Sequence, residues 1–97
     1  MEIRKIENGS QLTLALEGRL DTVTAPQLEN SVSALDGVDT LTLDFDKLTY
    51  ISSAGLRVLL MLHKKFSGKG GFTVTNVCPA VKEVFELTGF SDVLNIQ

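Results

Sequence analysis

The sequence predicts an α/β fold in which a mixed sheet of four to five strands combines with helices in the order ββαβαβα. Four segments alternate apolar and polar residues with the period of two that is typical of strands, and three others repeat apolar residues at helical spacing. From the second strand onward, the two kinds of segment alternate along the chain. Each segment made of a strand, a helix and the next strand is long enough to form a right-handed crossover between parallel strands.

The first two strands are predicted to form a hairpin. Residues Glu2 to Glu7 and Gln11 to Glu17 flank Asn8-Gly9, and leucines alternate with polar or small residues along the second segment. Asn-Gly supplies the positive φ angles of a tight type I′ turn. We therefore expect these two strands to be antiparallel, unlike the later ones.

A first helix is predicted after Gly18-Arg19-Leu20-Asp21. Thr24-Ala25-Pro26-Gln27 places a Thr three residues before a Gln and a Pro in the first turn, a pattern typical of a helix N-terminus. Apolar side chains at i, i+4 and i+7 give the helix one apolar stripe, and Gly37 is its expected end. The stripe consists of Leu28, Val32 and Leu35.

The rest of the chain continues the alternation. Thr40 to Phe45 is a predicted third strand, Ser53 to Phe66 a second helix and Phe72 to Val77 a fourth strand. Pro79 opens a third helix, and the tail from Phe90 to Gln97 is expected to pack back on the core. Glycines end the second and third helices. These are Gly68 and Gly89.

Composition excludes several function classes. With 97 residues, 43% apolar and 22% charged, the chain is expected to be one domain, residues 1–97. No apolar run approaches the roughly 20 residues of a membrane span, and the N-terminal residues do not have the pattern of a secretory signal. The charges are scattered and sum to −3, so we expect no basic stripe that could bind nucleic acid. We expect a cytoplasmic protein with no direct nucleic-acid or membrane partner. One cysteine, Cys78, and one histidine, His63, indicate neither a disulfide nor a metal site.

The turn Ser52-Ser53-Ala54-Gly55 is the most informative motif. A Ser before an apolar helical run is most often an N-cap, whose hydroxyl accepts a hydrogen bond from a free backbone N–H. Gly55 is not explained in this way, because a glycine in the first helical turn costs about 1 kcal/mol relative to Ala. Four small residues leave the helix start bare, which suits close approach by another molecule. The positive end of the helix dipole would also tolerate a phosphate on a serine there.

A catalytic function is not indicated by the residues. Ser53 and His63 lie ten residues apart on one predicted helix, roughly 15 Å at 1.5 Å per residue, too far for a nucleophile and its base. Asp44 and Asp46 would share a strand face, either as a general acid and base or as a solvated strand end. We therefore predict no catalytic residue, no metal ligand and no cofactor.

The chain resembles the STAS-domain anti-sigma factor antagonists of bacteria, and the resemblance covers nearly all of it. The central block is strongly specific, and the flanking blocks match in order and separation. The matching segments are Gly18-Arg19-Leu20-Asp21, Leu43-Asp44-Phe45, Tyr50-Ile51, Ser52-Ser53-Ala54-Gly55-Leu56-Arg57-Val58-Leu59 and Val77-Cys78-Pro79-Ala80-Val81. The resemblance implies a STAS fold over residues 1–97.

The resemblance also implies a partner switch. In that family the phosphorylated serine lies two residues before the glycine of the helix start, which here selects Ser53, with Ser52 as the alternative. Unphosphorylated, the chain would bind an anti-sigma factor that is itself a serine kinase and so free the sigma factor. Phosphorylation would end binding, and a serine phosphatase would reset the switch. The implied partner-binding residues are Asp21, Ser52, Ser53, Ala54, Gly55 and Arg57.

Two alternatives stay open. Asp21 is equally well explained as a turn or cap residue. The chain as a whole could instead be a STAS-domain regulatory or docking subunit of a transport or stress-signalling complex, with a serine loop that is not phosphorylated.

Overall fold

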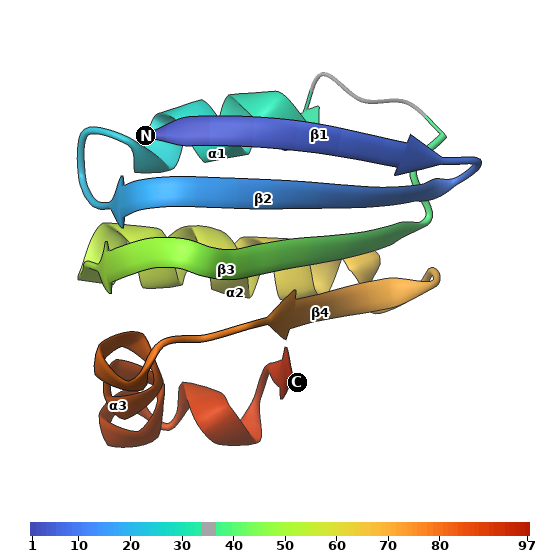
Figure 1. The fold of residues 1–97 in the computed structure, drawn as a ribbon. Coiled ribbons are helices and arrows are strands. Elements are labelled where there is room, and N and C mark those ends of the chain that lie inside the picture. Colours follow the sequence, from blue (N-terminus) through green and yellow to red (C-terminus); the bar gives the residue numbers. More distant parts are fainter. Residues whose placement is uncertain (34–36) are drawn as a thin grey trace.

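Five strands form one mixed sheet in the computed structural model, which describes residues 1–33 and 37–97. The strand order is β1-β2-β3-β4-β5, with β1 antiparallel to β2 and all later neighbours parallel (Figure 1). The mixed sheet expected from the sequence is therefore confirmed, and the tail supplies its fifth strand. The strands are β1 (Glu2–Asn8), β2 (Gln11–Leu20), β3 (Thr40–Ile51), β4 (Gly71–Thr75) and β5 (Asn95–Ile96).

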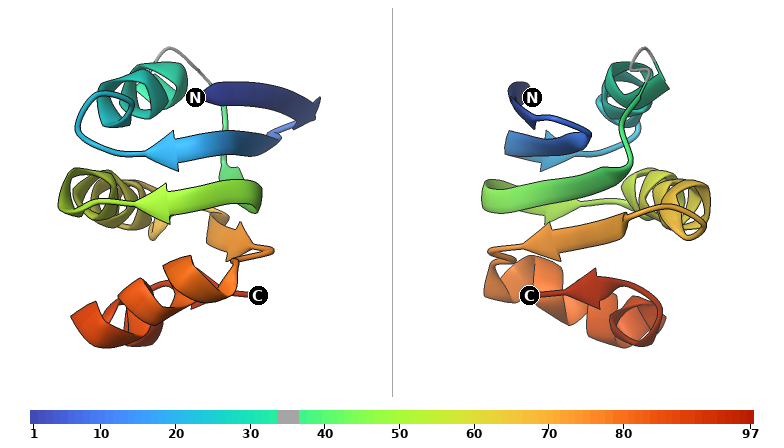
Figure 2. Two further views of the ribbon diagram at one scale, coloured as in Figure 1. Left: turned by 60° about the vertical axis from the view of Figure 1, so that its left-hand side comes forward. Right: turned by 90° about the vertical axis from the view of Figure 1, so that its right-hand side faces the viewer.

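The helices α1 (Ala25–Ser33) and α2 (Ser53–Phe66) cover one face of the sheet (Figure 2). The third helix, α3 (Pro79–Thr88), lies past the end of β4 and beside β3, where the Phe45 and Phe85 ring centroids are 6.4 Å apart. A short 3₁₀ helix, η1 (Phe90–Asp92), leads back to β5. Leu35 of the predicted apolar stripe lies outside the described residues.

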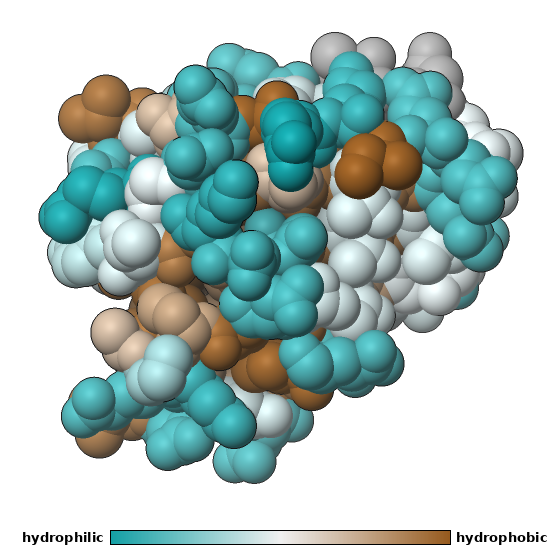
Figure 3. Space-filling model, viewed as in Figure 1, coloured by the Kyte–Doolittle hydropathy of each residue, from teal (hydrophilic) through white to brown (hydrophobic). Residues whose placement is uncertain are grey.

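The core lies between the sheet and the helices α1 and α2. Every second residue of β2, and of β3 as far as Phe45, faces it, and one stripe of each helix packs against them, because both patterns place apolar side chains on a single face. The opposite face of the sheet is open: hydrophilic and intermediate side chains cover much of it, and hydrophobic surface gathers near α3 (Figure 3). The largest fully buried side chains include Leu12, Leu14, Leu16, Leu28, Leu41, Leu43, Phe45, Leu59, Phe66 and Phe85.

The third strand is longer than the alternation of its residues indicates. We predicted a strand that ends at Phe45, whereas β3 continues to Ile51. Phe45 and Leu48 are both buried with two exposed residues between them, and the register with β2 shifts at this point. Such an irregularity lengthens the strand but breaks the period of two. The extension matters for function, because it carries the end of β3 to the start of α2.

The hairpin turn is displaced by one residue from its predicted position. Asn8 pairs with Gln11, so the two turn residues are Gly9 and Ser10. Gly9 has a φ of 65°, whereas Ser10 is not at positive φ. A positive φ at the first turn position alone is typical of a type II′ turn, not the type I′ turn that we predicted. Both turns produce the same antiparallel pair.

The first helix begins where the sequence indicates, but its N-terminus is held differently. We expected Thr24 and Gln27 to cap the helix. Instead the Thr24 hydroxyl donates to the carbonyl of Arg19 at 2.7 Å and accepts from the Asp21 N–H at 2.8 Å. The Gln27 side-chain amide donates to the carbonyl of Met1 at 3.0 Å. Thr24 therefore closes the turn that precedes α1, and Gln27 ties α1 to the start of β1.

Candidate functional site

The parallel strands β2 and β3 end side by side, and the helices α1 and α2 follow them at the same edge of the sheet (Figure 1). Leu20 is paired with Ile51 in the ladder, and the N–H of Ser52 donates to the carbonyl of Leu20 at 2.9 Å. Asp21 and Ser52 are the next residues of the two segments, so they lie close together. The carboxyl ends of parallel strands are the usual place for functional groups in α/β folds.

The two serines of the turn have different environments. Ser52 is half-buried and is the N-cap of α2: its hydroxyl oxygen accepts a hydrogen bond from the Gly55 N–H at 3.4 Å, a long contact for this kind of bond. Ser53 is the first helical residue and is exposed. Within residues 1–33 and 37–97, no hydrogen bond engages its hydroxyl. Ser52 therefore acts as the cap, and the hydroxyl of Ser53 is accessible.

Gly55 faces the interior, which corrects our interpretation of the helix start. It is buried, and a Cβ built on it would lie 2.8 Å from Cγ1 of Ile51, 2.9 Å from Cγ of Leu20 and 2.9 Å from the carbonyl oxygen of Leu20. We expected Gly55 to be part of a bare helix start that another molecule could approach, and that expectation is wrong for this residue. The glycine lets α2 approach the ends of β2 and β3 closely, so it shapes the site from within.

Asp21 organises the turn that leads into α1. Its Oδ1 accepts hydrogen bonds from the backbone N–H groups of Val23 at 3.0 Å and Thr24 at 3.1 Å. The bond from the Thr24 N–H is the main cause that lowers the pKa of the Asp21 carboxyl group below 3.8. The turn or cap function that we left open for Asp21 is therefore present. A role in partner binding stays a prediction.

A cation lies at the same edge. The guanidinium group of Arg19 stacks over the ring of Tyr50, with its Cζ 4.0 Å from the ring centroid, and its Nε is 3.9 Å from Oδ2 of Asp21. Because Arg19 and Tyr50 are partners in the ladder between β2 and β3, this contact joins the ends of the two strands.

A groove of about 330 Å³ runs between α1 and α2, next to this edge. Two of the predicted surface residues, Ala54 and Arg57, line it from α2. The groove residues that belong to α1 were not predicted, because the sequence gives no sign that exposed residues of α1 face those of α2. Val23 in the preceding turn is 84% exposed, so apolar surface adjoins the groove. The other lining residues are Thr22, Ala25, Pro26, Glu29, Val58 and Met61.

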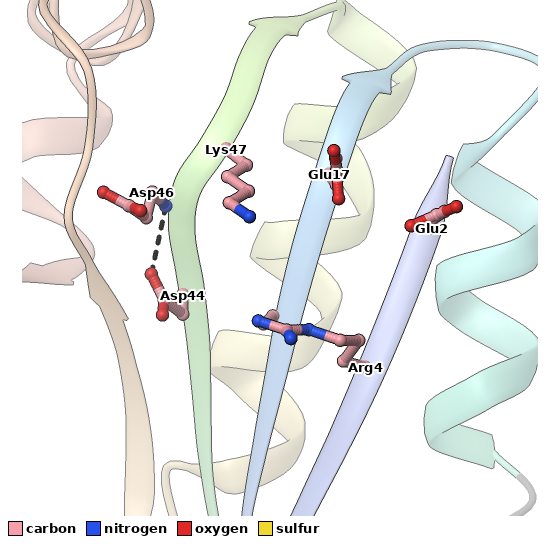
Figure 4. Close-up of a pocket in the computed structure, with 7 residues that line it drawn as sticks. Glu2, Arg4, Glu17, Asp44, Asp46 and Lys47 are labelled. Carbon is pink, nitrogen blue, oxygen red and sulfur yellow. Dashed lines mark hydrogen bonds between the residues drawn. The ribbon is translucent and has the colours of Figure 1, made fainter.

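A second, smaller hollow lies on the open face of the sheet. It measures about 40 Å³, enough for only a few water molecules, and is lined by side chains of β1, β2 and β3 (Figure 4). Asp44 and Asp46 both line it, but Oδ1 of Asp44 accepts hydrogen bonds from the Asp46 N–H and from the Asn76 side chain, both at 3.0 Å. Asp44 therefore holds the irregular part of β3, and because β3 continues to Ile51 the pair lies within the strand, not at the solvated strand end that we named as one possibility.

Among residues 1–33 and 37–97, no group of three or more His, Cys, Asp or Glu side chains is arranged to hold a metal ion. No helix in that part of the chain has the length and apolar character needed to cross a membrane.

Comparison with known proteins identifies relatives of this architecture. Residues 3–95 match the family described as "Mlab, STAS domain". The chain is 36% identical, over 88 residues, to BtrV of Bordetella bronchiseptica, assigned as an anti-sigma factor antagonist; the match covers 88% of this chain and 76% of that protein.

Solved structures agree with this match. An anti-sigma factor antagonist from Mycobacterium paratuberculosis has a TM-score of 0.86 at 25% identity, with 98% of this chain and 83% of that chain covered. The phosphorylated form of the Bacillus cell fate determinant SpoIIAA has a TM-score of 0.76 at 19% identity, with 99% and 91% covered. The chain belongs to the STAS-domain family of anti-sigma factor antagonists.

Proposed function

We propose that this chain is a partner switch: unphosphorylated, it binds an anti-sigma factor serine kinase through the edge around Ser53 and so frees a sigma factor. Phosphorylation of Ser53 ends the binding, and a serine phosphatase restores it. The observation that carries the proposal is the accessible hydroxyl of Ser53 at the start of α2, beside the groove between α1 and α2.

The position of Ser53 suits a phosphate in the free chain. The first turn of α2 contains no acidic side chain, and the positive end of the helix dipole lies there. A phosphate would add a charge of about −1.5 to −2 to an exposed site, so the fold has no buried charge to accommodate. Support also comes from SpoIIAA, whose phosphorylated form shares this fold.

The same phosphate would oppose a docked partner. A closely packed interface would have to remove water from the phosphate and place its own groups against the added charge. Loss of affinity therefore needs no change of fold.

The chemical step belongs to the kinase. The Ser53 oxygen would form a bond to the γ-phosphorus of ATP as the bond from that phosphorus to the β-phosphate bridging oxygen breaks, giving ADP, while the hydroxyl proton leaves to a kinase base. ATP and magnesium would be bound by the kinase, and this chain would contribute the acceptor hydroxyl and no catalytic group. We place this chain in the cytoplasm, together with the kinase and the sigma factor that it would regulate.

Phosphoryl transfer from the cognate anti-sigma factor kinase tests the proposal. With Mg-ATP, the parent chain and Ser52→Ala should each accept one phosphate, and Ser53→Ala should accept none. Phosphopeptide mapping identifies the modified residue. A phosphate on Ser52 would overturn the residue assignment, and a parent chain that binds the kinase without accepting phosphate would favour an unphosphorylated docking subunit.

A further inference from the structure

Arg57 lies one helical turn after Ser53 on the exposed side of α2. Residues four apart on a helix are surface neighbours, with Cβ atoms about 5–6 Å apart. Helical side chains also tilt toward the N-terminus, so a long side chain covers the turn that precedes its own Cα. The guanidinium group of Arg57 can therefore reach a group attached to the Ser53 oxygen.

Arg57 makes no ion pair with another described residue. Within the described residues, the one ion pair closer than 4.0 Å joins Arg19 to Asp21. Glu29 lines the same groove as Arg57 from the α1 side, but no ion pair joins the two. The first turn of α2 offers Arg57 no carboxylate either. The cation is thus available to an anion that arrives at the helix start.

We infer that Arg57 is the counter-ion of a phosphate on Ser53, within the same helix. A guanidinium group binds phosphate through two parallel hydrogen bonds, which a lysine cannot reproduce. The inference rests on the proposed phosphorylation of Ser53 and extends it to the groove. Phosphorylation changes two charges of the docking surface, because it adds an anion at Ser53 and engages the cation of Arg57.

The other charges at this edge do not replace Arg57. Arg19 already contacts Asp21 and stacks on Tyr50. Asp21 opposes a phosphate through its own negative charge, and so does Glu29 on the far wall of the groove. Removal of Arg57 should therefore leave the phosphate without a nearby free cation.

The second pKa of the phosphate, ordinarily about 6, gives a direct test. Phosphoserine is installed at position 53 of the full chain by chemical or genetic means, and the phosphorus-31 NMR signal is followed as a function of pH. The pKa in the parent should be lower than in Arg57→Gln by at least about 0.2 pH unit, the effect of a surface i,i+4 ion pair. Arg57→Lys should fall between them.

Lys64→Gln is the matched control, since it removes an exposed positive charge about three turns beyond Ser53 on α2. Its phosphate should titrate like that of the parent. Equal pKa values in the parent and Arg57→Gln would overturn the inference, as would an equal shift in Lys64→Gln. Because the phosphate is installed without a kinase, the result is independent of whether a kinase modifies Ser53 in cells.

Discussion

Substitution of Gly55 by Ala should destabilise the fold, although Ala is the better helix former. The added methyl group would meet Ile51 and Leu20 side-chain atoms at 2.8 and 2.9 Å and the Leu20 carbonyl oxygen at 2.9 Å. The carbonyl cannot move freely, because it accepts the 2.9 Å hydrogen bond from Ser52 that links the end of β2 to the start of α2. The clash must be relieved by moving α2 outward.

The net cost follows from two opposing effects. Overpacking of a well-packed site costs about 1–3 kcal/mol, and the upper part of this range, about 2–3 kcal/mol, applies here because one of the atoms that the methyl group meets is a hydrogen-bonded backbone carbonyl oxygen. Helix propensity returns about 1 kcal/mol of this when Gly becomes Ala. We expect a loss of about 1–2 kcal/mol in the free energy of unfolding. For a domain of this size, each kcal/mol lowers Tm by about 4–8 °C, so the expected decrease is about 4–16 °C.

Thermal and urea unfolding followed by circular dichroism would measure this loss. Gly68→Ala is the matched control, because a Cβ at Gly68 has no atom within 4 Å and the residue has no positive φ. Its Tm should equal or exceed that of the parent. A Gly55→Ala protein at least as stable as the parent would refute the close packing of α2 on β2 and β3, and would restore an outward-facing glycine.

Three further predictions address the elements around the site. Ser52→Ala should lower the free energy of unfolding by about 0.5–1 kcal/mol, near the lower end for a lost N-cap because the hydrogen bond is long. An unchanged free energy in urea unfolding would show that the Ser52 hydroxyl does not stabilise α2. The Asp21 carboxyl group should titrate with a pKa below 3.8 in an NMR titration. Its stabilisation of the turn is then present above pH 3.8 and is lost as the pH falls through the lowered pKa. A midpoint at or above 3.8 would contradict the hydrogen bonds from the N–H groups of Val23 and Thr24. Phe85→Ala should cost about 3–5 kcal/mol, because this fully buried ring packs on Phe45, and a loss below 1 kcal/mol would show that α3 does not rest on β3.

The sequence predicted the fold well wherever apolar residues recur with a clear period. The three helices and the first four strands follow from that recurrence, because burial on one face imposes it. The end of β3 was missed since Asp46 and Lys47 are both exposed and interrupt the alternation. The sequence allowed a fifth strand but did not locate β5, because two residues cannot display a period.

The site was predictable in part. The accessible serine at the start of α2 follows from the order of strand, turn and helix. The inward direction of Gly55 had a signal that we did not use: it lies four and seven residues before Leu59 and Leu62, both fully buried on the same stripe. The groove had no such signal, because the distance between α1 and α2 depends on how both helices pack on the sheet.

The affinity of the cognate anti-sigma factor kinase for two forms of this chain tests the partner switch most directly. Titration calorimetry would compare the unphosphorylated chain with the chain that carries phosphoserine at position 53, after circular dichroism has shown that both are folded. We predict at least a tenfold weaker binding of the phosphorylated form, equivalent to about 1.4 kcal/mol, with an unchanged spectrum. Equal affinities of the two folded forms would contradict the switch at Ser53.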